Sequence, residues 1–314
     1  MPSNTKEIKK RIKSVKNIRQ ITKAMQLVAA SKMKKAQMRA RSADAYAYGA
    51  LEILKNITER EHEIKEHVYW KGNAKQKKIG MILISTNRGF CGGLSISLFQ
   101  KVLRWTSEMK KGGHEIDAVT IGKKGRIFAK KIGMNIVADF SDIQEYFSIR
   151  DIGGITKIAT QDFRAGAYGK VYVAYNQFVN VLIQKPVIRQ ILPIEISSFE
   201  KITETDNEAQ ARLFKKEGTK KEEEQQKEQA VYVFEPSPVK VFEELVPYLI
   251  EVEIYKALLE AQASEHSARM VAMKNATDKG GELIGDLQLS YNQARQASIT
   301  QEIAEIASGA MATA

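Results

Sequence analysis

The sequence predicts an α/β domain carried on two long helices, one from each end of the chain, that pair with each other in antiparallel fashion. Three features lead to this prediction: an apolar stripe at helical spacing near the N-terminus, a second such stripe over the last third, and alternating strand and helix patterns between them. The expected segments are an N-terminal helix (1–65), an α/β domain (66–202), a charged insertion with a linker (203–238) and a C-terminal helix (239–314).

The N-terminal helix is predicted from apolar or small residues that recur at steps of three or four. They are Ile8, Ile12, Val15, Ile18, Thr22, Met25, Ala29, Met33, Ala36, Ala40, Ala43, Ala47, Ala50, Leu54 and Ile57. Asn4 followed by Glu7 suggests a helix cap, and no proline interrupts the chain between Pro2 and Pro186. One helix of roughly 80 Å follows at 1.5 Å per residue, and so long a stripe needs a partner helix.

The C-terminal third supplies that partner. Its stripe, at the same spacing, comprises Leu249, Val252, Tyr255, Leu259, Leu283, Leu287, Tyr291, Ala294, Ile299, Ile303 and Ile306. Pro238 or Pro247 suits its first turn. Residues 239–314 hold eleven acids and six bases, which complements a basic N-terminal helix. The pair Gly280-Gly281 is a soft point at which small side chains would let the two backbones approach.

The middle of the chain reads as a mostly parallel sheet with helices between the strands. Strands are expected at 78–85, 116–121 and 135–140, and helices at 94–111, 122–131 and 152–167. Residues 170–194 alternate as two strands of a hairpin or edge pair. Residues 203–235 break this pattern, and the run 215–229 is charged and of low complexity, which predicts an exposed insertion.

The net charge of +12 is concentrated at one end of the chain. Residues 1–41 contain 13 Lys and Arg and a single acid, Glu7, whereas the rest holds 36 bases and 36 acids. A transit peptide fits poorly, because lysine dominates and the helical pattern continues. A nucleic-acid arm and a helix that seeks an acidic protein partner are nearly even on the residues alone.

Other classes of function are less favoured. The single cysteine, Cys91, excludes an internal disulfide, and no apolar run approaches the roughly 20 residues of a membrane span. The loop 86–93 lacks the Lys-Ser/Thr of a phosphate-binding loop, so a structural turn is favoured over a nucleotide site. His266 has no second ligand at metal spacing and is expected on a helix surface. No catalytic residue, cofactor or metal is therefore predicted.

Four blocks of the chain resemble the γ subunits of bacterial-type, F-type proton-translocating ATP synthases. They are Ile18–Lys32 (IRQITKAMQLVAASK), the loop Thr86–Gly93, Ala263–Met273 (ASEHSARMVAM) and Tyr291–Ile306 (YNQARQASITQEIAEI). The blocks occur in the family's order at both ends and in the first strand–loop of the middle, and residues 203–235 extend the family pattern. The resemblance implies an antiparallel coiled coil that bears a Rossmann-like α/β domain.

The resemblance also implies a mechanical role without catalysis by this chain. The coiled coil would stand inside the ring of α and β subunits with its tip, Ser308–Ala314, in a sleeve, and the α/β domain would meet the ε subunit and the membrane c-ring. The chain would be peripheral, on the cytoplasmic face of the bacterial plasma membrane, with neither nucleic acid nor membrane insertion. The alternative is a basic coiled-coil scaffold that binds nucleic acid or another helical protein.

Six residues match family positions that face the β subunits, and the resemblance implies partner contacts for them. Lys23 and Met25 come from the first block and Arg269 from the third, and the fourth block supplies Arg295, Gln296 and Thr300. The last three lie near one helical face at i, i+1 and i+5. Without the resemblance, ordinary solvated helix residues would be the preferred interpretation.

Overall fold

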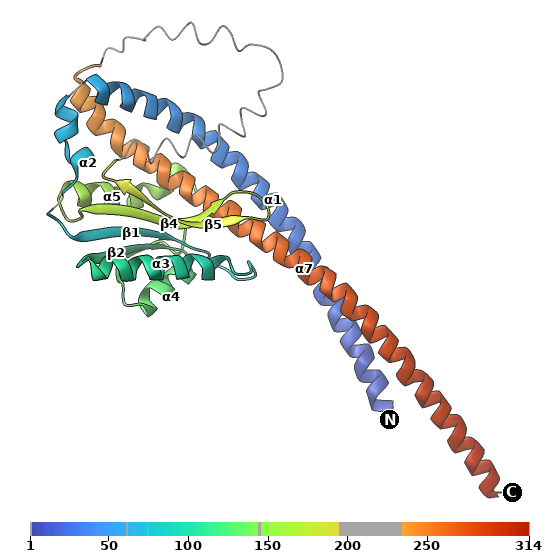
Figure 1. The fold of residues 1–314 in the computed structure, drawn as a ribbon. Helices are drawn as coiled ribbons and strands as arrows, with labels where there is room; N and C mark the ends of the chain where they lie inside the picture. The colour runs from blue at the N-terminus through green and yellow to red at the C-terminus, as the bar shows by residue number, and fades with distance from the viewer. Residues whose placement is uncertain (1, 61, 74, 144–145, 195–233, 314) are drawn as a thin grey trace, which may run out of the picture. The chain divides into compact units, whose positions relative to one another are not determined.

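The computed structural model describes residues 2–60, 62–73, 75–143, 146–194 and 234–313. Most of the predicted insertion, residues 203–233, lies outside them. The elements in chain order are α1 (Pro2–Arg60), η1 (His62–Glu66), α2 (Val68–Lys71), β1 (Lys78–Ile84), α3 (Leu94–Lys111), β2 (Glu115–Ile121), α4 (Lys123–Lys131), β3 (Asn135–Asp139), η2 (Ile149–Ile152), α5 (Gly153–Arg164), β4 (Lys170–Phe178), β5 (Gln184–Leu192) and α7 (Pro238–Thr313) (Figure 1).

These elements confirm the predicted fold class: two long terminal helices and an α/β middle. The residues group into two compact units, and both long helices contribute to each. The first unit contains 1–32, 90–92 and 266–314, and the second contains 33–89 and 93–265. The four segments expected from the sequence divide the chain along its length, whereas each compact unit draws on several of those segments.

The second unit is built on a five-stranded sheet in the order β3-β2-β1-β4-β5. The first four strands are parallel, as the alternation of strands and helices predicts. β5 runs antiparallel to β4, which confirms the expected hairpin over 170–194. Buried residues of β1 face both sides of the sheet, so this central strand joins two cores.

Helices cover the two faces of the sheet (Figure 1). Leu98 and Val102 of α3 and Ala129 of α4 are buried against Met81 and Leu83 of β1. The opposite face packs on α5 and on the parts of α1 and α7 that belong to this unit, through a larger cluster. The outer surfaces of α3 and α4 are therefore on the side of the sheet away from the long helices.

The loop 86–93 serves as a turn in this domain. The Oγ1 atom of Thr86 lies 3.0 Å from Oγ of Ser95, and Oδ1 of Asn87 accepts a 2.9 Å hydrogen bond from the backbone N–H of Lys123. Gly122, just before α4, has φ +95°, and a Cβ there would lie 2.2 Å from the carbonyl oxygen of Ser85. These contacts hold the residues that follow β1 against those that follow β2, and the positive φ of Gly122 suits a glycine.

α7 begins at Pro238, so the alternative start at Pro247 is wrong. The helix continues through Pro247 because its neighbours Val246, Leu249 and Ile250 are fully buried, and this packing offsets the lost backbone hydrogen bond. The predicted cap at Asn4 is also wrong. α1 already begins at Pro2, and proline with its fixed φ is well suited to the first helical position.

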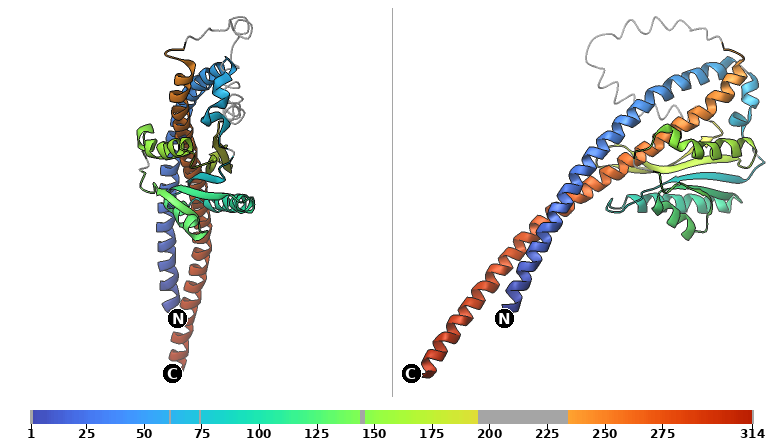
Figure 2. Two further views of the ribbon diagram at one scale, coloured as in Figure 1. Left: turned by 90° about the vertical axis from the view of Figure 1, so that its left-hand side faces the viewer. Right: turned by 180° about the vertical axis from the view of Figure 1, so that it is seen from behind.

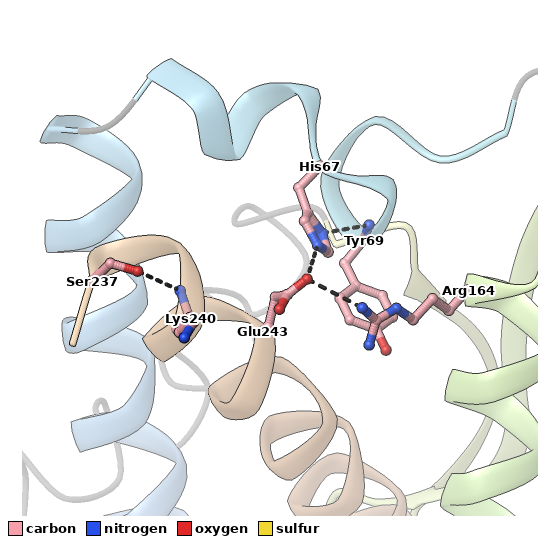
Figure 3. Close-up of polar contacts among 6 residues, drawn as sticks. All are labelled: His67, Tyr69, Arg164, Ser237, Lys240 and Glu243. Atoms are coloured by element: carbon pink, nitrogen blue, oxygen red, sulfur yellow. Dashed lines mark hydrogen bonds and ion pairs between the residues drawn. The ribbon is translucent and has the colours of Figure 1, made fainter. Parts of the chain in front are cut away.

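The first turn of α7 is held by polar contacts (Figure 3). Oγ of Ser237 accepts a 3.3 Å hydrogen bond from the backbone N–H of Lys240, which caps the helix. Oε1 of Glu243 accepts a 3.2 Å hydrogen bond from Nη2 of Arg164 and lies 3.3 Å from Nε2 of His67. His67 Nδ1 in turn accepts from the backbone N–H of Tyr69 at 3.3 Å. The start of α7 is thus tied to both α5 and α2.

Further along α7, ionisable groups meet the sheet. Glu253, Lys256 and Glu260 share one face of α7, and Glu260 interacts with the other two, with Tyr175 of β4 and with Arg189 of β5. The Oε2 atom of Glu260 is buried and has no hydrogen-bond partner in the described part of the chain. Burial raises the pKa of Glu260 to about 7, because nearby Lys256 and Arg189 offset only part of the cost of burying its charge.

This carboxyl should make the stability of the second unit depend on pH. The raised pKa means that the folded state favours protonated Glu260, so stability is highest below the ordinary pKa of 4.5 and falls as pH rises to about 7. The fall should be at most about 3 kcal/mol, at 1.36 kcal/mol per pKa unit. Urea denaturation followed by the fluorescence of Trp70 and Trp105 measures it, since both lie in this unit.

The matched variant is Glu260→Gln, which keeps the shape of the side chain and cannot ionise. Its stability should stay nearly level between about pH 5 and pH 7.5, where the wild-type chain loses stability. Equal slopes in the two proteins would show that another group titrates over this range.

Candidate partner-binding surface of the paired helices

The first compact unit is an antiparallel pair formed by the N-terminal part of α1 and the C-terminal part of α7. Thr22 Oγ1 and Thr277 Oγ1 form a buried 2.8 Å hydrogen bond between the two helices. Gly280 and Gly281 lie against the side chain of Arg19, which confirms the antiparallel register. A Cβ at either glycine would meet Arg19 at an ordinary contact distance, so this contact does not require glycine.

Small and short side chains dominate the buried contact between these helices. The buried residues in this unit include Ile12, Thr22, Ala29, His266, Ser267, Met273 and Thr277. Small residues bring two helices close together and leave much of the outer surface of each helix uncovered. The predicted stripe therefore marks the seam correctly at Ile12, Thr22 and Ala29.

Several large apolar residues of the predicted stripe lie outside this seam. Ile18 and Leu283 are about half exposed, and Ile299, Ile303 and Ile306 are also exposed, so their placement in the seam is wrong. Ile21, Leu27 and Val28 add to the exposed apolar surface. So many exposed large apolar residues on one helix pair are typical of an interface with another protein.

The end of α7 runs on past the start of α1 in this unit (Figure 2). The register set by Thr22 and Thr277 places Arg295 level with the first turn of α1. Ile303, Ile306 and Met311 are 62%, 73% and 83% exposed. These side chains lie beyond the start of α1, and nothing in the described part of the chain buries them.

The six predicted contact residues fall at two levels along this pair. Lys23, Met25 and Arg269 lie near the Thr22–Thr277 contact, whereas Arg295, Gln296 and Thr300 lie at the level where α1 starts. The separation between Arg269 and Arg295 along one helix is about 40 Å at 1.5 Å per residue. The six predicted contact residues therefore form two separate groups along the helix pair rather than one cluster.

At the level of the Thr22–Thr277 contact, Lys23 is exposed and its Nζ donates a 3.3 Å hydrogen bond to Oε1 of Gln26, while Met25 is partly buried. Arg269 is also partly buried, with Nη1 3.3 Å from Nδ1 of His266. The prediction that His266 lies on a helix surface is wrong, because it is only 7% exposed. His266 is therefore a buried neighbour of Arg269.

At the level where α1 starts, Arg295, Gln296 and Thr300 are all exposed. The Thr300 hydroxyl donates a 3.0 Å hydrogen bond to the backbone carbonyl of Gln296, within the helix. Its donor is therefore engaged already, whereas the side chains of Arg295 and Gln296 point donors toward solvent-accessible space. Arg295 and Gln296 are the stronger candidates for hydrogen bonds to another chain.

Sequence reasoning missed one exposed group in this unit. Phe90, in the loop 86–93, has φ +64° and is 71% exposed, while the adjacent Cys91 is buried. A left-handed φ is uncommon for a bulky residue and persists only where the surroundings hold it. No pattern in the sequence indicates this conformation.

Among the described residues, no helix is both long enough and apolar enough to cross a membrane.

Comparison with known proteins agrees with this arrangement. The family model described as ATP synthase matches residues 4–313. The ATP synthase gamma chain of Roseiflexus castenholzii is 39% identical over 100% of this chain and 99% of its own length. That of Legionella pneumophila strain Paris is 36% identical and covers 99% of both chains.

Solved structures show the same fold at lower sequence identity. A chain in the structure of the OSCP, F1 and c-ring of the Euglena gracilis mitochondrial ATP synthase has a TM-score of 0.61 and 17% identity, and covers 100% of this chain and 95% of its own. A chain in the central stalk and c-ring of the Tetrahymena thermophila enzyme has a TM-score of 0.54 and 22% identity, covering 82% and 99%.

Long paired helices that leave an apolar surface uncovered, joined to an α/β domain, define a protein that works inside a larger assembly. The full-length relatives give that assembly its identity. The chain belongs to the family of ATP synthase gamma chains.

Proposed function

We propose that this chain is the central rotor shaft of an ATP synthase and couples proton movement through the membrane sector to ATP synthesis or hydrolysis on the β subunits. The observation that carries the proposal is the exposed apolar surface of the helix pair, which continues into the turns that bear the exposed side chains of Ile303, Ile306 and Met311. A ring of α and β subunits, with an apolar sleeve at its far end, would bury these side chains.

The remaining partners follow from the family. Two of the similar structures are of ATP synthase assemblies that contain a c-ring. For this chain, the α/β domain would bind the ε subunit and the c-ring. The complex would then lie on the cytoplasmic face of the bacterial plasma membrane, with this chain as a peripheral, non-catalytic subunit.

In this role the chain acts by differential contact. The two faces of a helix pair with a narrow seam are unlike each other, so rotation presents different side chains to each β subunit in turn. A face that fits one nucleotide-binding conformation better than another shifts the balance between them. Arg295 and Gln296 at one level and Lys23, Met25 and Arg269 at the other would make the polar contacts.

Copurification tests the proposal. A tagged chain expressed in the cells from which it comes should bring down nucleotide-binding α and β subunits in equimolar amounts. The complex should persist at about 1 M salt, where the Debye length is about 3 Å, because the buried contact is largely apolar. The isolated chain should not hydrolyse ATP. Recovery of nucleic acid in place of these subunits would favour the basic-scaffold alternative.

A further inference from the structure

The α3–α4 layer, which covers one face of the sheet in the second unit, carries a concentration of positive charge. Together the two helices contain nine Lys and Arg and one acid, Glu108. All nine basic residues are exposed. Arg126, 3.2 Å from Asp139, is the one among them that pairs with a carboxylate in the described residues. A surface that serves only solubility mixes both signs, so this imbalance calls for an anionic partner.

Exposed aliphatic side chains accompany these bases. Ile96 and Leu103, seven residues apart on α3, are 61% and 45% exposed, and Ile127 of α4 is 60% exposed. The inward faces of the same helices are occupied by Leu98, Val102 and Ala129, so the three exposed residues point away from the sheet. Phe99 of α3 stacks on Phe128 of α4 with ring centroids 4.3 Å apart, which holds the two helices side by side.

We propose that the outer surface of α3 and α4 binds the headgroup region of an anionic phospholipid bilayer, with Ile96, Leu103 and Ile127 at the level of the upper acyl chains. Basic residues around exposed aliphatic side chains are the pattern of helices that lie in a membrane interface. Lysine clusters of this size are attracted to anionic lipids through the surface potential. The contact is peripheral and needs no membrane span.

The type of base favours a lipid surface over an acidic protein. Seven of the nine basic residues are lysines and two are arginines. Protein–protein interfaces are enriched in Arg and depleted in Lys, because a lysine is strongly hydrated and does not fix a bidentate geometry. A headgroup layer needs charge more than fixed geometry, since its phosphates are mobile.

The test uses the full-length chain with Cys91→Ser and one new cysteine for a nitroxide label. The label is placed at Ile127→Cys on α4 or, as a control, at Gln161→Cys on α5, which covers the opposite face of the sheet. Vesicles contain either phosphatidylcholine with an equal part of phosphatidylglycerol or phosphatidylcholine alone. The measurement is the collision rate of the label with a water-soluble nickel chelate and with oxygen, which partitions into the bilayer. A label that enters the bilayer collides less with the chelate and more with oxygen.

The proposal expects the label at position 127 to lose access to the nickel chelate with anionic vesicles at about 0.1 M salt, and to regain it at about 1 M salt. Phosphatidylcholine vesicles should give no protection, and the label at position 161 should stay accessible throughout. Protection of both labels, or of neither, would overturn the proposal.

Two variants with equal loss of charge separate this surface from the basic end of α1. The first replaces Lys110, Lys123, Lys130 and Lys131 by Gln. It should raise the lipid concentration needed to protect position 127 by about 100-fold or more, since each base near the surface contributes about 1 kcal/mol. The second replaces Lys9, Lys10, Lys13 and Lys16 by Gln, and position 127 should remain protected. The reverse result would overturn the proposal.

One outcome assigns the surface to an acidic protein instead. If vesicles leave position 127 accessible while the assembled complex protects it without lipid, a neighbouring subunit occupies α3 and α4 and the proposal is wrong. The vesicle measurement needs no assembled complex, so its failure leaves the rotor function untouched. Failure of copurification would equally leave the vesicle result standing.

Discussion

A disulfide that joins position 269 of this chain to a loop of a β subunit should stop ATP turnover by the assembled complex completely. If the helix pair rotates past the β subunits, a covalent bond between them holds the rotor at one angle. The change is Arg269→Cys with Cys91→Ser, together with one cysteine on the facing β loop. ATP hydrolysis is measured after oxidation and again after reduction.

The control carries the same Arg269→Cys change without the cysteine on β, and oxidation should leave its activity unaltered. Reduction should restore turnover in the cross-linked sample to the level of that control. Full ATPase activity in a quantitatively cross-linked complex would mean that this part of α7 does not move past the β subunits, and the shaft mechanism would then fail.

Replacing Arg295 and Gln296 together by Ala should reduce the ATPase activity of the complex by at least about ten-fold. Each hydrogen bond that involves a charged group contributes about 1.5–3 kcal/mol when it is desolvated, and 1.36 kcal/mol is a ten-fold change in rate. Both side chains are exposed in this structure, so their loss should leave the helix pair folded. Steady-state hydrolysis by the assembled complex and circular dichroism of the chain are the measurements.

The chain offers two comparisons for this change. Asn292→Ala alters another exposed residue of α7 and should have no effect. Thr300→Ala should have a small effect, because the Thr300 hydroxyl already donates to the Gln296 carbonyl. An equal loss from Asn292→Ala, or no loss from the double variant, would show that Arg295 and Gln296 are ordinary solvated residues.

Much of the fold could be predicted because local patterns specify it. The helix expected at 94–111 matches α3 as observed, and the strand at 78–85 matches β1 to within one residue. The order of the strands could not be predicted, because parallel pairing joins segments far apart in the chain. The C-terminal helix expected at 239–314 matches α7, but local pattern could not choose between Pro238 and Pro247 for its first turn, since packing of the neighbours of Pro247 outweighs the local cost of a proline.

The candidate surface was harder to predict than the fold. Spacing at three and four residues shows that a stripe exists, but it does not show whether the chain itself or another chain covers it. Ile18 and Ile303 follow the same spacing as Ile12, yet Ile12 is buried and the other two are exposed. His266 is expected on a helix surface because it has no second metal ligand at the right spacing, but that argument does not test burial against another helix, and His266 is buried. Both errors concern the identity of the partner helix.

The exposed end of α7, beyond the start of α1, has a consequence for how the protein enters its assembly. A helix in a protein gains most of its stability from the surface on which it packs, and the turns around Ile303 and Ile306 have no such surface among the described residues. In the free chain these turns should fray, and they should become fully ordered only when the sleeve encloses them. Part of the free energy gained when the tip of α7 enters the sleeve is then used to order the tip itself. The chain should therefore bind the sleeve less tightly than a preformed helix that buries the same area.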